Sequence, residues 1–124
     1  MNNREDFDKY IMDTYGVCAD FPWGEDGPAV YRHMSNGKCF AFVMTVHKSR
    51  FGLDDDCYVD IVNLKCDPLM IGSLYKENGV YPAYHMNKNH WISVFLDGSV
   101  DAETIKWLVS SSFELTKKLK NKKS

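Results

Sequence analysis

The chain has 124 residues, of which 44% are hydrophobic and 26% are charged, and its formal net charge is −2. This length and apolar content are typical of one folded domain with a single core and exclude a disordered polar chain. The slightly acidic balance lacks the strongly basic signature that marks most nucleic-acid-binding domains.

The first residues, Met1 to Asp6, show no basic start followed by an apolar run, which a signal peptide would require. No stretch of the sequence approaches the roughly 18 to 20 apolar residues that a membrane span needs. We therefore expect a cytoplasmic protein without a membrane segment.

The N-terminal part of the chain predicts a helix. One face would carry side chains that recur at spacings of three and four: Phe7, Tyr10, Ile11, Thr14, Tyr15 and Cys18. Gly16 and the turn-rich segment after it provide the end of the helix. Within that segment we expect Trp23 to cover one end of the core, and its exposure for stacking or for a protein partner is the alternative.

The next two segments predict a β-hairpin, with strands over residues 29–34 and 38–46 around a turn at 35–37 that contains Asn-Gly. Alternation along the second strand places Phe40, Phe42, Met44 and Val46 on one face and Cys39, Ala41, Val43 and Thr45 on the other. Both faces are apolar, so this strand is predicted to be central in its sheet.

Residues 47–56 are polar and lack periodicity, which predicts a long connection before the next strand at 57–64. Connections of this kind are where a function can be added. Asp54, Asp55 and Asp56 lack the alternating ligands, the central glycine and the distal glutamate of a calcium loop. Their charge would oppose that of Lys48 and Arg50 if this connection contacted nucleic acid.

The second half of the chain predicts a short helix, two strands and a long helix. Asp67 and Pro68 suit the N-cap and the first position of a helix over 68–77. A strand at 80–86 contains Pro82, which favours an edge position, and a second strand covers 91–96. Ser99 or Asp101 would cap the last helix, whose apolar stripe comprises Ile105, Leu108, Val109, Phe113, Thr116 and Leu119.

The predicted order is α-β-β-β-α-β-β-α, and its mostly short connections favour an antiparallel sheet. The sequence thus predicts the α+β class: two layers, with a five-stranded sheet covered by helices, in one domain over residues 1–124. Residues 117–124 form a lysine-rich tail that is expected to fray.

The four cysteines, Cys18, Cys39, Cys57 and Cys66, are separated by 21, 18 and 9 residues. No C-x-x-C pair is present, so neither a metal site nor a redox site is indicated. We expect reduced thiols that are mostly buried, and no cofactor.

Three segments follow one another in the second half of the chain: Asn63-Leu64-Lys65-Cys66-Asp67-Pro68, then Tyr84-His85-Met86-Asn87-Lys88-Asn89-His90-Trp91, then Phe95-Leu96-Asp97-Gly98-Ser99. In order and spacing, and in the H-x-N-K-x-H-W core of the middle segment, they resemble the MmcQ/YjbR family. The resemblance implies a small two-layer fold described as CyaY-like or secretion-chaperone-like. It also suggests DNA binding, as an analogy drawn from the shape of the fold.

The best candidate site lies around the turn that follows Pro82. His85, Lys88, His90 and Trp91 bring two imidazoles, an ammonium and an indole close together, where they could contact an anionic or planar ligand. Lys65, just before the second helix, could add a positive charge. The alternative is structural: the histidines satisfy backbone groups and Trp91 belongs to the core.

Three hypotheses of function follow. The leading one is a non-enzymatic protein that binds nucleic acid through Lys65, His85, Lys88, His90 and Trp91. The second is a protein-interaction module similar to a secretion chaperone, which requires a contiguous apolar patch or a symmetric dimer. The third is a small-molecule-binding protein or enzyme that uses His85 and His90 in one pocket. The motifs of several enzyme classes are missing from the sequence, and no catalytic residue is assigned.

Overall fold

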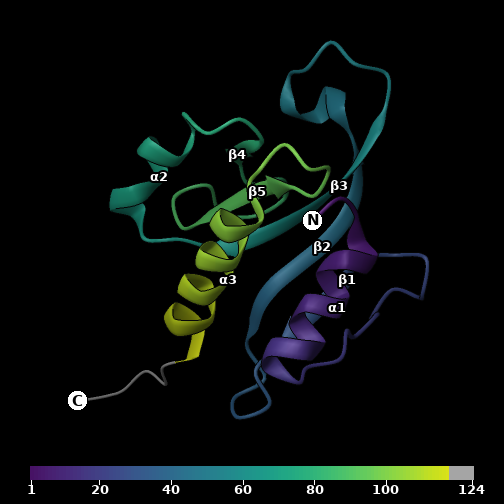
Figure 1. Cartoon of the computed structure of the whole chain (residues 1–124), viewed down its shortest axis with the longest axis vertical. Coiled ribbons are helices and arrows are strands. Elements are labelled where there is room, and N and C mark those ends of the chain that lie inside the picture. Colours follow the sequence, from purple (N-terminus) through teal and green to yellow (C-terminus); the bar gives the residue numbers. More distant parts are fainter. Residues whose placement is uncertain (118–124) are drawn as a thin grey trace.

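A five-stranded antiparallel sheet organises residues 1–117, which are the residues that the computed structural model describes (Figure 1). The strands are β1 (Ala29–Arg32), β2 (Cys39–His47), β3 (Tyr58–Lys65), β4 (Val80–Pro82) and β5 (Trp91–Phe95), in the spatial order β1-β2-β3-β5-β4. The helices are α1 (Arg4–Tyr15), α2 (Pro68–Leu74) and α3 (Ala102–Lys117), and a 3₁₀ turn, η1 (Lys48–Phe51), lies between β2 and β3. The predicted α+β class and element order are confirmed, whereas the CyaY-like comparison stays a prediction.

The first helix shows how local signals set the element boundaries. The side chain of Asn3 accepts a hydrogen bond from the amide of Asp6 and caps the helix. Gly16 ends it with φ of 66°, a left-handed conformation that costs glycine little. Cys18 therefore lies beyond the helix and is exposed, although it was predicted to belong to the helical stripe.

The second helix is shorter than predicted. Asp67 caps it as expected, because its carboxylate accepts a hydrogen bond of 2.9 Å from the amide of Leu69. The helix ends at Leu74, and the amides of Lys76 and Glu77 then bond three residues back, to Ser73 and Leu74, in tight turns. Residues 75–77 thus form the turn that leads into β4.

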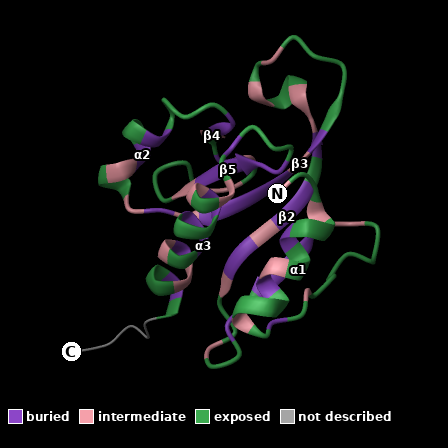
Figure 2. Cartoon of the chain, in the orientation of Figure 1, coloured by how far each residue is buried: buried purple, intermediate pink, exposed green. Residues whose placement is uncertain are grey.

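The main core lies between the sheet and the helices. Figure 1 shows α1 and α3 on the same side of the sheet, and Figure 2 shows that the buried residues line the strands and the inner helix faces. The largest members of this core that are fully buried include Phe7, Ile11, Leu64, Ile92, Ile105 and Leu108. Burial of each such side chain contributes roughly 1.5–3 kcal/mol, which makes this interface the principal source of stability.

A second, smaller core covers the opposite face of the sheet. It consists of Met44, Val46, Val59, Ile61 and Phe95, with Phe42, Phe51, Leu53, Tyr81 and Tyr84 packed against them. The segments that cover this face are loops rather than helices. Both faces of β2 are therefore apolar, as expected for the central strand that the sequence predicted.

One residue of β2 departs from the predicted alternation. Tyr31 pairs with Ala41 and Arg32 pairs with Cys39, which leaves Phe40 as an extra residue in the strand. This bulge turns Phe40 to the helix side, where its ring lies 5.0 Å from that of Phe113. The expectation that Phe40 shares a face with Phe42 was wrong because a bulge changes the direction of one side chain.

Other details also correct the sequence analysis. Trp23 is 66% exposed and contacts Phe42 at its edge, so it is not a core residue. All four cysteines are free as expected, but only Cys66 is buried. At the C-terminal end, Lys117 belongs to α3 and pairs with Glu114, while Leu119 and the rest of the lysine-rich tail lie outside the described residues.

None of the helices within residues 1–117 is long and apolar enough to cross a membrane.

Candidate functional site

The turn between β4 and β5 is held on the sheet by two buried polar side chains. Asn63 of β3 donates a hydrogen bond of 2.9 Å to the carbonyl of Tyr84. Ser93 of β5 accepts one of 2.9 Å from the amide of Tyr84 and donates to the side chain of Asn63. The backbone N–H and C=O of Tyr84 thus both have hydrogen-bond partners inside the protein, and these bonds fix where the turn leaves the sheet.

His85 follows with φ of 58°, and among residues 1–117 it is the one residue other than glycine with a positive φ. Histidine tolerates this region better than most residues do. The ring of His85 lies 3.9 Å from that of Tyr84, so the two rings form a pair at the start of the turn. Positive φ together with an exposed imidazole is a conformation that functional sites often contain.

Two of the three aspartates in the connection between β2 and β3 contact basic side chains of the same connection. His47 accepts a hydrogen bond from the amide of Ser49, and its Nε2 lies 3.2 Å from the carboxylate of Asp56. Lys48 pairs with Asp55 at 3.3 Å, and this hydrogen bond raises the pKa of Lys48. The prediction that these aspartates oppose the nearby positive charges therefore holds for Lys48, whose charge is neutralised by Asp55.

The same connection presents Arg50 to the turn that contains His85. Phe51, the next residue, packs its ring 5.1 Å from Phe95 and 5.4 Å from Tyr81. This packing holds η1 against the face of the sheet that the helices leave free. Arg50 is exposed, and it forms no ion pair with any other residue of the described part of the chain.

These two segments enclose a hollow of about 400 Å³, which we call the basic hollow. Its walls are formed by Arg50, Phe51, Tyr81, Pro82, Ala83, Tyr84, His85 and Lys88. Three basic side chains and three aromatic rings are present, and within residues 1–117 no carboxylate lines the space. Such a lining suits a ligand that combines an anionic group with a planar one.

The five predicted site residues divide into two groups. His85 and Lys88 line the basic hollow. Lys65 and Trp91 lie opposite each other on β3 and β5, and both are half-buried. The carbonyl of His90 accepts a hydrogen bond of 2.8 Å from the amide of Cys66, while the His90 side chain is exposed. Lys65, His90 and Trp91 are absent from the lining of the hollow.

Arg50 is the residue that sequence reasoning missed. It belongs to the polar connection at 47–56, far from the turn in sequence, and only the packing of Phe51 brings the two segments together. The signal that could have found it is the length of that connection combined with an aromatic residue beside a cation.

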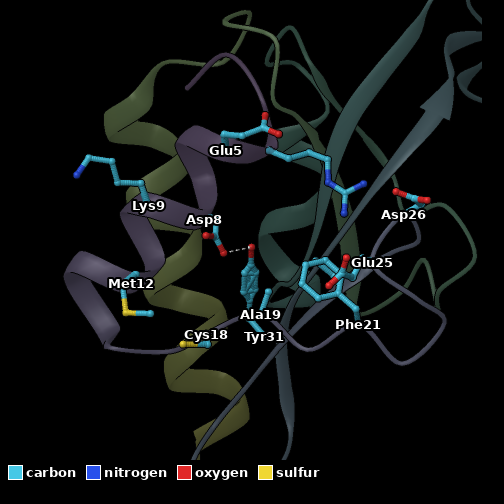
Figure 3. A pocket seen from close by; sticks show the side chains of 12 residues that line it. Glu5, Asp8, Lys9, Met12, Cys18, Ala19, Phe21, Glu25, Asp26 and Tyr31 are labelled. Carbon is cyan, nitrogen blue, oxygen red and sulfur yellow. Dashed lines mark hydrogen bonds between the residues drawn. The ribbon is translucent and has the colours of Figure 1, made fainter.

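A larger hollow, of about 540 Å³, lies between α1 and the segment that leads into β1 (Figure 3). Figure 3 shows Glu5 and Asp8 on the α1 side and Glu25 and Asp26 on the opposite side, and Arg4 and Lys9 also line it. The hydroxyl of Tyr31 donates a hydrogen bond of 2.9 Å to Asp8, and burial raises the pKa of Tyr31. This acidic hollow disfavours anions.

The described residues contain no group of three or more His, Cys, Asp or Glu side chains that could hold a metal ion. The two imidazoles that motivated the third hypothesis do not both line the basic hollow, because His85 is part of its lining and His90 is not. Binding of an anionic, partly planar ligand is the chemistry that this geometry favours.

Comparisons with known proteins identify the family to which the chain is similar. A family model described as YjbR matches residues 12–115. The Bacillus subtilis protein YyaQ, described as uncharacterized, is 40% identical over 119 residues, which cover 94% of this chain and 100% of the relative. The Escherichia coli (strain K12) protein YjbR, also described as uncharacterized, is 39% identical over 54 residues, or 43% of this chain and 46% of the relative.

Two solved structures share the fold. A crystal structure of a Pseudomonas syringae protein matches with a TM-score of 0.88 and 43% identity, over 92% of this chain and 98% of that one. The Deinococcus radiodurans protein DR2400, described as a DUF419 domain, matches with a TM-score of 0.71 and 26% identity, over 95% of this chain and 80% of that one. The sheet and helices described above are therefore found in experimentally solved relatives.

Proposed function

The chain belongs to the YjbR family, and we propose that it is a non-enzymatic protein that binds nucleic acid at the basic hollow. The observation that carries the proposal is the composition of the lining, in which Arg50, His85 and Lys88 surround aromatic rings without a carboxylate. Phosphates provide the anionic partner for the cations, and bases provide a planar partner for the rings.

Arg50 is the strongest contributor in this proposal. Its guanidinium can donate two parallel hydrogen bonds to a phosphate, which an ammonium cannot do. The carboxylates of Asp55 and Asp56 contact Lys48 and His47, which leaves Asp54 as the aspartate of this connection without an ion pair within residues 1–117. Lys65 and Trp91 pair across β3 and β5 outside the hollow, and in this proposal they are secondary contacts.

A second candidate function is favoured by a different surface. Leu69 is 92% exposed and Trp107 is 53% exposed, and both line a groove between α2 and α3 together with Met70 and Leu74. Exposed apolar side chains that gather in one groove are typical of protein-interaction sites. This groove supports the protein-interaction module as the alternative to nucleic-acid binding.

The test is a titration of the protein against single- and double-stranded DNA and RNA at low salt, followed by fluorescence anisotropy. We expect measurable binding that weakens as salt rises, with a log–log slope of roughly −0.7 to −0.9 for each phosphate contacted. Arg50→Ala and Lys88→Ala are expected to reduce affinity and to make the slope shallower by about one contact each.

Lys76→Ala is the matched control, because Lys76 is exposed and is absent from the lining of the basic hollow. It removes the same formal charge as Lys88→Ala. The absence of binding to all four nucleic acids at low salt would contradict the proposal. An equal loss of affinity in Lys76→Ala and Lys88→Ala would show that the attraction is unspecific, and would also contradict it.

A further inference from the structure

A second hollow adjoins the basic hollow along one shared wall. It measures about 320 Å³, and Arg50 and Tyr84 line both spaces. The other side chains of interest in its lining are Arg4, Asp26, His47 and Tyr58. The two hollows are thus neighbours across Arg50 and Tyr84, and a ligand longer than one hollow can extend from one into the other.

Each of the two hollows is lined by an accessible aromatic side chain. Tyr58 is 68% exposed, and its ring meets that of His47 edge to face at 5.0 Å. Tyr84 is half-buried and faces the basic hollow beside His85. A nucleobase can stack on a tyrosine ring whatever its identity, because each base has a flat π-surface.

The free positive charge lies at the shared wall. In the second hollow, Arg4 already donates to the carbonyl of Gly27 at 2.9 Å, and His47 already contacts Asp56. Asp26 adds a carboxylate there, so the second hollow suits a base better than a phosphate. Arg50 carries no ion pair within residues 1–117, and it is placed to meet the phosphate that joins two nucleotides.

We propose that the two hollows form one groove for single-stranded nucleic acid, which holds two successive nucleotides with the linking phosphate at Arg50. The inference rests on the proposed function and restricts the class of nucleic acid that is bound to single strands. In a duplex the bases are stacked on one another and paired, so their faces are unavailable to Tyr58 and Tyr84. A single strand can turn its bases out onto these rings.

The experiment is a competition titration at constant low salt, in which a labelled eight-nucleotide single strand is displaced by unlabelled competitors. The competitors are a mononucleotide, a dinucleotide, a tetranucleotide and a blunt duplex of the same base composition. We expect the dinucleotide to bind roughly 10-fold or more tightly than the mononucleotide, because a second stacked base and a linking phosphate are added. The duplex is expected to compete at least about 10-fold less well than the single strand per nucleotide.

Tyr58→Ala isolates the second hollow, because Tyr58 lines that space and not the basic hollow. We expect it to weaken dinucleotide binding by roughly 5-fold or more, and to weaken mononucleotide binding by a smaller factor. Tyr75→Ala is the matched control, since Tyr75 is an exposed tyrosine at the end of α2. Thermal unfolding of both variants verifies that they fold.

The outcomes separate this inference from the proposed function. Preferential binding of the duplex, or a dinucleotide no better than a mononucleotide, would overturn the single-strand groove while nucleic-acid binding stands. An equal effect of Tyr58→Ala and Tyr75→Ala on the dinucleotide would also overturn the groove. Failure of every nucleic acid to bind would overturn both. A dinucleotide preference that only Tyr58→Ala removes would support the groove.

Discussion

His33 is a buried imidazole at the point where β1 leads into the hairpin turn, and it is 4% exposed. Its Nε2 lies 2.8 Å from the hydroxyl of Thr116, and its ring lies 4.2 Å from that of Phe113 on α3. Burial is the main cause that lowers the pKa of His33. Nearby Lys117 and Lys38 lower it further, whereas a backbone hydrogen bond at Phe113 and the charge of Glu114 act in the opposite direction.

This residue makes stability depend on pH in a defined direction. Above a pH of about 6.5, the ordinary pKa of histidine, His33 is neutral in both the folded and the unfolded chain. Below that pH the unfolded chain binds a proton that the folded protein resists, so the free energy of unfolding falls. Urea unfolding at pH 8, 7, 6 and 5 measures this loss.

His33→Gln is the control, because it keeps a polar partner for Thr116 and cannot titrate in this range. The variant is expected to lose less stability between pH 8 and pH 5 than the parent protein. Parallel pH profiles for the two proteins would show that His33 is not responsible.

At the scale of the elements, the side chain of Asn63 links β3 by hydrogen bonds to β5 and to the turn between β4 and β5. It belongs to β3, it is fully buried, and it contacts Ser93 on β5 as well as the carbonyl of Tyr84 in the turn that carries His85 and Lys88. The sheet thereby positions the basic hollow, although Asn63 does not line it. Loss of this side chain should affect both stability and the proposed binding.

Asn63→Ala is expected to lower the free energy of unfolding by about 1–3 kcal/mol, because it leaves the carbonyl of Tyr84 and the hydroxyl of Ser93 without their partner. Asn78→Ala, at an exposed position, should change it by less than about 0.5 kcal/mol. Chemical denaturation measures both. In the folded protein, affinity for the oligonucleotide should fall in Asn63→Ala alone, and unchanged affinity would contradict the positioning role.

At the scale of the whole molecule, the two cores share their strands. The main core packs on one face of β2, β3 and β5, and the smaller core packs on the other face of the same three strands. If these strands separate, the apolar side chains of both cores become exposed to water at once. Residues 1–117 are therefore expected to unfold as one cooperative unit.

A urea titration followed by far-ultraviolet circular dichroism and by tryptophan fluorescence checks this expectation. The two curves should coincide, with one midpoint and an m-value of about 1–3 kcal/mol/M. Trp23, Trp91 and Trp107 report from different parts of the fold. Repeating the measurement with Trp23→Phe removes the most exposed of the three reporters, and two resolved transitions in either protein would contradict a single cooperative unit.

The charge of the molecule is also arranged at this scale. A net charge of −2 disfavours nucleic-acid binding on average, but Glu5, Asp8 and Glu25 line the hollow beside α1 and neither of the other two hollows, while Asp26 lines both that hollow and the second hollow. Arg50 and Lys88 form no ion pair within residues 1–117, and both line the basic hollow, which has no carboxylate in its lining. Composition sums over all surfaces, whereas binding depends on one of them.

The sequence by itself determined the class of the fold and the order of its elements, whereas the strand predicted over 80–86 ends at Pro82 and the helix predicted over 68–77 ends at Leu74. These features depend on local signals, such as the cap at Asp67, the end of α1 at Gly16 and the proline of an edge strand. Local signals failed where the outcome depended on contacts between distant segments. The bulge in the pairing of β1 with β2 turned the Phe40 side chain to the other face, and Trp23 stayed exposed because no other segment within residues 1–117 packs over it.

Only the tertiary structure decided the composition of the candidate site. The turn at residues 85–91 was visible in the sequence as a cluster, but the fold directs His85 and Lys88 into the basic hollow and keeps Lys65, His90 and Trp91 outside its lining. Arg50 enters from another segment because Phe51 packs on Tyr81 and Phe95. Which side chains meet depends on packing between distant segments, and spacing along the chain does not encode that packing.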